Sequence, residues 1–211
     1  MRIDSDHNNE YRYPVSDKED QSEVEFGITP SQTVGPYVHI GLVNPGAEII
    51  AHEGETSSDQ VEVTVVVRDG GNHPISDAMV EIWQAGDEGT YNSPLDPRVG
   101  DAATDKGFRG LGRGFADRDG AVTFTTIVPA EVMDEAPHLK VGIFARGMLE
   151  RLYTRMYFPE NADANEADPV YQLVDEPRRH LLVAEATDGG YRFDVQVQSE
   201  DPEAETPFFR V

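Results

Sequence analysis

Short runs of alternating apolar and polar residues recur along the chain from Gln60 to near its end. Many of their residues are β-branched or aromatic, and Gly, Pro and Asp, which favour turns, separate the runs. Runs of this length and spacing are typical of an all-β sandwich. We therefore predict an antiparallel β-sandwich with long loops and one or two short helices. The expected strands lie at 61–67, 78–85, 120–129, 138–147, 149–158 and 190–198.

Two further patterns complete the prediction of elements. The segments 161–174 and 176–186 begin with acidic residues and continue with spaced apolar ones, which is the pattern of a helix N-terminus. Between the first two expected strands, Asp69, Gly70 and Gly71 have the chemistry of a hairpin turn or a short loop. We expect helix only in the region after residue 160.

The N-terminal residues differ in composition from the rest of the chain. Residues 1–26 are polar and poor in aliphatic side chains, which indicates an arm that is flexible or lies against a partner. The remainder is long enough for one domain with a sizeable core. We therefore predict a single β-sandwich domain at 27–211.

The chain is strongly acidic, with 40 Asp and Glu against 17 Lys and Arg, and a formal net charge of −23. Such a surface cannot neutralise phosphates, which excludes the usual nucleic-acid-binding proteins and makes anionic membranes poor partners. The acids are interleaved with the apolar runs, and Arg outnumbers Lys 14 to 3. We interpret this composition as adaptation to high salt, which screens the repulsion between carboxylates.

Several classes of chemistry lack the residues that they require. There is no Cys, which removes disulfides, thiolate catalysis and thiolate metal sites. No Gly-rich phosphate loop, HExxH pair or G-x-S-x-G sequence occurs. The chain also has no apolar run of membrane-spanning length and no hydrophobic signal core at its N-terminus, so we expect a cytoplasmic protein.

One segment stands out because it carries no formal charge: TPSQTVGPYVHIGL, residues 29–42. With EIWQAGDEGTY, FTTIVP, APHLKVGIFARG, RMYF, YRFDVQV and PFFRV, it follows the order found in the intradiol ring-cleaving dioxygenases. The chain resembles this family over nearly everything from Thr29 onward. Its resemblance is greatest to the alpha chains of members that act on protocatechuate. These are β-sandwiches paired with a related beta chain, which holds a non-haem ferric ion through two Tyr and two His.

The resemblance shows that only part of this ligand set is present. Tyr91 in WQAGDEGTY matches the first Tyr position, but the loop AEVMDEA has no Tyr for the second. His138 matches the first His of an H-x-H pair, whereas Lys140 occupies the second position. An ammonium repels a ferric ion and offers no lone pair. We therefore interpret Tyr91, His138 and Lys140 as vestigial ligand positions. We expect no metal and no catalytic residue in this chain alone, with Fe(III) held by the partner beta subunit.

The resemblance also implies a role for the uncharged segment. In the family's alpha chains the T-x-G-P-Y sequence reaches the pocket of the partner beta chain, and the matching residues are Thr33, Gly35, Pro36 and Tyr37. Arg146 in FARG matches an arginine that faces the same pocket and could hold the carboxylate of a dihydroxybenzoate. The implied reaction is cleavage of protocatechuate with O2 to 3-carboxy-cis,cis-muconate.

Other interpretations of these residues stay open from the sequence. Tyr91 could be a rim aromatic, His138 a hydrogen-bonded residue at a strand end, Trp83 a core residue and Arg146 a surface cation. For the whole chain, one alternative is a non-enzymatic β-sandwich scaffold or binding module that lost the iron site. Another is a homo-oligomeric iron enzyme with rearranged ligands.

Overall fold

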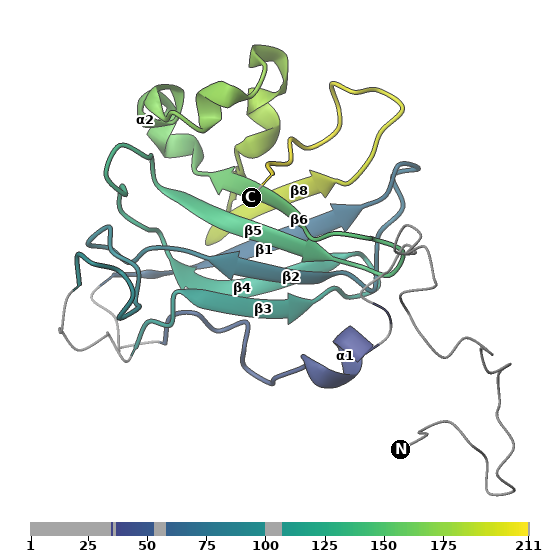
Figure 1. The fold of residues 1–211 in the computed structure, drawn as a ribbon, viewed down its shortest axis with the longest axis horizontal. Coiled ribbons are helices and arrows are strands. Elements are labelled where there is room, and N and C mark those ends of the chain that lie inside the picture. The colour runs from purple at the N-terminus through teal and green to yellow at the C-terminus, as the bar shows by residue number, and fades with distance from the viewer. Residues whose placement is uncertain (1–34, 36, 53–57, 100–106, 211) are drawn as a thin grey trace, which may run out of the picture. The chain divides into compact units, whose positions relative to one another are not determined.

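The computed structural model describes residues 35, 37–52, 58–99 and 107–210. In this part of the chain two four-stranded sheets pack as a β-sandwich (Figure 1), which confirms the predicted fold class. The first sheet has the strand order β4-β1-β8-β7 and the second has β3-β2-β5-β6. The strands are β1 (Gln60–Arg68), β2 (Met79–Trp83), β3 (Leu111–Phe115), β4 (Ala121–Ile127), β5 (His138–Phe144), β6 (Leu152–Tyr157), β7 (Glu185–Thr187) and β8 (Gly190–Gln196).

One strand pair departs from the antiparallel arrangement. β1 runs parallel to β8, from Glu62 opposite Gly190 to Arg68 opposite Gln196. The other strand pairs are antiparallel. β1 and β2 belong to different sheets, so the turn at Asp69 is a loop between sheets and not a hairpin. The Asp69 carboxylate stabilises it by accepting hydrogen bonds from the backbone N–H groups of Gly71 and His73, both at 2.9 Å.

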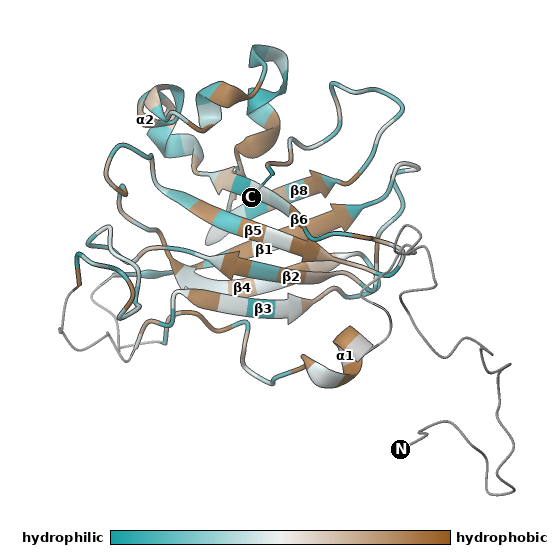
Figure 2. Ribbon diagram, viewed as in Figure 1, coloured by the Kyte–Doolittle hydropathy of each residue, from teal (hydrophilic) through white to brown (hydrophobic). Residues whose placement is uncertain are grey.

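The hydrophobic core lies between the two sheets. Alternate residues of a strand point to the same face, and Val63, Val65 and Val67 of β1 are all fully buried against residues of the second sheet such as Val141 and Ile143. Figure 2 shows the same alternation, with hydrophobic positions interrupting hydrophilic ones along β2 and β5. The sandwich therefore provides a rigid support for the loops at the strand ends.

The predicted helical region is only partly α-helical. α2 covers Ala162–Ala167, and short 3₁₀ helices follow at Tyr171–Leu173 and Glu176–Leu182, with another before it at Pro159–Asn161. Residues 185–186, predicted as helix, belong to β7. A second α-helix, α1 (Tyr37–Gly41), lies in the uncharged segment, where none was predicted. No helix in the described ranges is long and apolar enough to cross a membrane.

A buried carboxylate fastens this helical region to the second sheet. Asp168 is completely buried, and it accepts hydrogen bonds from the Tyr157 hydroxyl of β6 and from the backbone N–H of Ala136. The backbone N–H groups of Val170 and Tyr171 also donate to it, at 2.7 and 3.0 Å. A buried charge is tolerated when it is saturated with donors in this way. Asp168 therefore fixes the end of the loop that enters β5.

Candidate functional site

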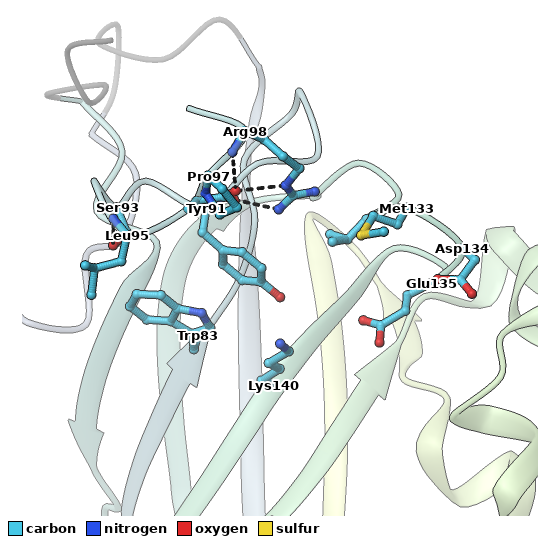
Figure 3. A pocket seen from close by; sticks show the side chains of 12 residues that line it. Trp83, Tyr91, Ser93, Leu95, Pro97, Arg98, Met133, Asp134, Glu135 and Lys140 are labelled. Atoms are coloured by element: carbon cyan, nitrogen blue, oxygen red, sulfur yellow. Dashed lines mark hydrogen bonds and ion pairs between the residues drawn. The ribbon is translucent and has the colours of Figure 1, made fainter. Parts of the chain in front are cut away.

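A pocket of about 740 Å³ opens where β2 ends and β5 begins (Figure 3). A volume of this size is typical of sites for small organic molecules. The walls come from the end of β2, the loop that follows it, the loop before β5 and the first residues of β5. The lining residues are Trp83, Tyr91, Ser93, Leu95, Asp96, Pro97, Arg98, Val132, Met133, Asp134, Glu135 and Lys140.

Two stacked aromatic rings form one wall of the pocket. The rings of Trp83 and Tyr91 lie 5.6 Å apart and within 17° of parallel. Tyr91 follows a tight turn in which Gly89 adopts a φ of +71°, and a Cβ at Gly89 would collide with the backbone carbonyl of Glu131. Only glycine fits such a position readily. The W-Q-x-x-x-x-G-x-Y sequence thus places Tyr91 back over Trp83. Trp83 is half-buried and lines the pocket, so the interpretation of Trp83 as a core residue is wrong.

An internal ion pair braces the loop that carries Tyr91. The Asp96 carboxylate accepts bonds from Arg98 Nε and Nη2, at 2.9 and 2.6 Å, and from the backbone N–H of Tyr91 at 2.9 Å. The hydrogen bonds from Arg98, followed by that from Tyr91, hold the pKa of Asp96 well below its usual range. Asp96 and Arg98 carry no recognisable sequence motif, so their pairing could be found only from the structure.

Lys140 extends into the pocket below Tyr91 (Figure 3). It lies opposite Trp83 in the β2–β5 ladder, and its Nζ is 4.8 Å from the centre of the Tyr91 ring. Among the described residues, Lys140 forms no ion pair and neither Lys140 Nζ nor the Tyr91 hydroxyl has a hydrogen bond. The structure therefore brings Tyr91 and Lys140 together at the wall of one pocket.

His138, by contrast, does not line the pocket. It is 3% exposed, its Nδ1 bonds the Ala136 carbonyl at 2.8 Å, and its Nε2 lies 3.6 Å from Glu135 Oε2. Burial, and then the positive charge of Arg155, lowers the pKa of His138 to about 4. The imidazole is therefore neutral near pH 7 and packs in the sheet beside Tyr157.

Glu135, which separates His138 from the pocket, forms an ion pair with Arg155. Arg155 Nη2 donates to Glu135 Oε1 at 3.0 Å, and its Nη1 lies 3.8 Å from Asp168. Burial alone would lower the pKa of Arg155, but the hydrogen bond to Glu135 and the interactions with Tyr157 together outweigh burial and raise that pKa. Glu135 and Arg155 were not singled out by the sequence, because their pairing joins a loop to a neighbouring strand.

These residues do not fit a ferric ion. Iron of this kind requires several neutral or anionic N and O donors that converge on one point, whereas here an ammonium stands beside Tyr91, and the buried His138 lies against Glu135 and does not line the pocket. Within the described ranges, no group of three or more His, Asp or Glu side chains has an arrangement suited to a metal.

Arg146 lies beyond the opposite end of β5 from this pocket. It follows the C-terminal end of β5, whereas Lys140 is near its beginning. Its side chain is 70% exposed, and its Nε donates to Asp77 Oδ2 at 2.6 Å. Figure 1 shows α1 near the end of β3 that corresponds to this end of β5. Tyr91 and Lys140 therefore lie at one end of β5, and Arg146 follows the other end.

The uncharged segment is described only in part. Gly35 has a φ of +64°, a backbone conformation that favours glycine, and Tyr37 is the first residue of α1. Thr33, Pro36 and the arm at 1–26 lie outside the described residues. α1 exposes a large hydrophobic residue, Ile40, at 75%, and Figure 2 shows hydrophobic colour on this helix.

Comparisons with known proteins agree with these observations. A family model described as Dioxygenase matches residues 35–199. The protocatechuate 3,4-dioxygenase alpha chain of Pseudomonas putida is 35% identical over 201 residues, covering 86% of this chain and 95% of that one. The alpha chain from Burkholderia cepacia is 39% identical over 199 residues, with coverages of 87% and 97%. The beta chain from Burkholderia cepacia is 32% identical over 163 residues, with coverages of 70% and 68%.

A solved structure shares the fold. The intradiol ring-cleavage dioxygenase from Tetranychus urticae superposes with a TM-score of 0.54 at 19% identity, over 71% of this chain and 83% of that one. This likeness concerns the sandwich alone. The matched family model and the sequence identities carry the assignment further: the chain belongs to the intradiol ring-cleavage dioxygenase family.

Proposed function

We propose that this chain is the alpha-type subunit of a cytoplasmic protocatechuate 3,4-dioxygenase, whose beta-type partner subunit holds Fe(III). The observation that carries the proposal is the extent of the similarity. The match spans 95% and 97% of two alpha chains but 68% of a beta chain. The proposed reaction opens the ring of protocatechuate between its two hydroxylated carbons and adds both atoms of O2, giving 3-carboxy-cis,cis-muconate.

The chemistry of this chain's own residues supports placing the iron in the partner. Lys140 occupies the position of a ligand and carries a positive charge, and the buried His138 does not line the Tyr91 pocket. Bound iron would supply the chemistry that activates the ring and O2. The role that we propose for this chain is to complete the pocket around the substrate.

Arg146 and the uncharged segment are the proposed contributors to that shared pocket. They are Thr33, Gly35, Pro36, Tyr37 and Arg146, of which Thr33 and Pro36 lie outside the described residues. A segment without charge can be buried against a partner without leaving carboxylates unpaired. The exposed Ile40 on α1 adds apolar surface at the same place.

The geometry of Arg146 suits the recognition of a carboxylate. Asp77 holds only its Nε, and the two terminal nitrogens have no hydrogen bond among the described residues. A guanidinium that is fixed at one edge can offer its other N–H groups to a planar anion. We propose that these nitrogens bind the carboxylate of protocatechuate and that Asp77 is a positioning residue.

Iron analysis of separately purified subunits tests the division of roles. This chain, purified alone in high salt, should contain no stoichiometric iron and no visible tyrosinate-to-iron absorption, whereas the partner subunit should contain iron. One tightly bound iron per isolated chain would overturn the proposal and favour the homo-oligomeric iron enzyme. An assembled pair that binds iron but never turns over protocatechuate would favour the non-enzymatic scaffold.

A further inference from the structure

The pocket at the beginning of β5 combines an aromatic wall with an apolar rim. Trp83 and Tyr91 stack on one side, and Leu95 and Met133 stand at the rim with 89% and 85% of their surface exposed. Exposed apolar surface that borders a pocket is typical of ligand-binding grooves, and here it belongs to a chain with a net charge of −23. The combination points to a ligand with a flat apolar body.

The charges around the pocket distinguish Lys140 from its neighbours. Arg98 forms an ion pair with Asp96, with 2.6 Å between Nη2 and Oδ2, and Glu135 forms one with Arg155, with 3.0 Å between Oε1 and Nη2. Asp134 stands at the exposed rim. Lys140 alone among the cations lining the pocket lacks a carboxylate partner within the described residues. In a chain with this excess of acids, an ammonium left without a partner beside a cavity is available for an anionic ligand.

We propose that this pocket binds a small aromatic carboxylate without a metal. The ring lies against Trp83 and Tyr91, and the carboxylate accepts charge-assisted hydrogen bonds from Lys140 Nζ. The Tyr91 hydroxyl, which points into the cavity in Figure 3, is the second donor. Stacking and a charged hydrogen bond together select a molecule that has both an aromatic ring and an acid group.

This binding site is separate from the proposed subunit role. The pocket lies where β5 begins, whereas Arg146 follows the end of β5. No bond is made or broken in this pocket. A ligand bound here stabilises the chain that binds it by mass action, so the pocket would link the stability of the subunit to the concentration of an aromatic acid.

Tryptophan fluorescence provides a direct readout, because Trp83 is the only tryptophan of the chain. The purified full chain, with a chelator present and at constant ionic strength, is titrated with 4-hydroxybenzoate. Phenol, which lacks the acid, and cyclohexanecarboxylate, which lacks the aromatic ring, are titrated in parallel. We expect 4-hydroxybenzoate to change the Trp83 signal saturably and to bind at least about tenfold more tightly than either control, the effect of one strong interaction.

Variants separate the role of Lys140 from that of net charge. Lys140→Met should weaken binding of 4-hydroxybenzoate by at least about tenfold, and Lys140→Arg should retain most of it. Arg118→Met, which removes one positive charge from the exposed turn between β3 and β4, should bind as the unchanged chain does. Equal binding by Lys140→Met and the unchanged chain, or equal binding of phenol and 4-hydroxybenzoate, would overturn the proposal.

A second measurement uses the unaltered chain and does not depend on how variants fold. The chain has only three lysines, Lys18, Lys106 and Lys140, so each can be followed by mass spectrometry after brief acetylation. Saturating 4-hydroxybenzoate should slow acetylation of Lys140 selectively, with Lys18 and Lys106 as internal references. Unchanged acetylation of Lys140, or protection that disappears when the chelator is added, would contradict binding at this metal-free pocket.

Discussion

Arg146 is a surface residue in the isolated chain, with one nitrogen bonded to Asp77 and most of its guanidinium exposed to solvent. Its proposed partner is the carboxylate of a substrate bound in the neighbouring subunit. In the assembled, iron-loaded enzyme, Arg146→Ala should lower kcat/KM for protocatechuate by about 10- to 100-fold, because a charge-assisted hydrogen bond is lost. Steady-state O2 uptake measures this change.

Catechol is the matched control for Arg146→Ala, because it lacks the carboxylate. Its turnover should fall much less than that of protocatechuate if Arg146 binds the carboxylate. Iron content should be the same in the variant and the unchanged enzyme. Unaltered kinetics with both substrates in a fully assembled, iron-loaded variant would show that Arg146 is only a surface charge.

The lowered pKa of His138 leads to a separate prediction about how the stability of the chain depends on pH. Its pKa in the folded chain is about 4, against an ordinary value of 6.5, because burial disfavours the imidazolium. Between these values the unfolded chain binds the proton that the folded chain rejects, so the free energy of unfolding falls as pH decreases. Above about pH 6.5 the contribution of His138 is complete, and it is lost as pH falls towards about 4.

Replacing His138 with Gln removes the titrating group while keeping a donor for the Ala136 carbonyl. Urea unfolding between pH 7 and pH 4 should therefore show a shallower loss of stability for His138→Gln than for the unchanged chain. The other ionisable groups are the same in both proteins, so the difference between the two curves reports on His138. Parallel curves would mean that His138 is readily protonated in the folded chain.

At the scale of elements, β3 is a strand that the sequence pattern did not predict. Its residues, LGRGF, lack the β-branched pattern of the other strands. Gly112 and Gly114 are required because a Cβ at Gly112 would lie 2.5 Å from Ile50, and one at Gly114 would collide with Val122 of the facing sheet. These glycines let the two sheets close together at the β3–β4 edge, a packing requirement that strand propensity does not reveal.

Close packing at this edge makes Gly114→Ala a sharp test. The added methyl group must displace Val122 in a filled core, so the free energy of unfolding should fall by about 1–3 kcal/mol. Gly41→Ala is the matched control, because nothing lies within 4 Å of a Cβ at Gly41, and its effect should be within about 0.5 kcal/mol. Urea unfolding of both variants measures the difference, and similar values would contradict the packing inferred for β3.

The sequence was most informative where local pattern and fold agree. The alternating runs correspond to β1, β2, β4, β5, β6 and β8, because burial of one face imposes a period of two. The helical predictions were less accurate, since acid-rich starts also precede 3₁₀ helices, and α2 ends at Ala167, just before Pro169. Asp96, Arg98 and Glu135 could not be identified as pocket residues, because their contacts depend on loops that meet only in the fold.

Trp83 shows a different limit of sequence analysis. Its apolar neighbours in β2 indicate a core residue, and Val80 and Ile82 are fully buried. Trp83 is the last residue of the strand and lies opposite Lys140, so it faces the pocket. Successive side chains of a strand point to opposite faces, so Trp83 shares a face with the partly buried Glu81 and not with Ile82; the apolar character of Trp83 hid this alternation in the sequence.

For the whole molecule, the net charge of −23 is the dominant feature. Carboxylate repulsion is weakly screened in dilute buffer and strongly screened at molar salt, where the Debye length is about 3 Å. The midpoint of thermal unfolding should therefore rise between low and molar KCl. A flat midpoint over this range would remove the main support for the proposed adaptation to high salt.

The central claim is that this chain completes the active site of an iron-bearing partner. Its most direct test is to titrate the chain into iron-loaded beta-type subunit at a fixed iron concentration and to follow protocatechuate-dependent O2 uptake. We predict that neither protein alone reaches full activity, and that activity rises with added chain to a plateau at a fixed ratio while bound iron stays constant. Full activity of the beta-type subunit alone, or activity proportional to iron bound by this chain, would contradict the account.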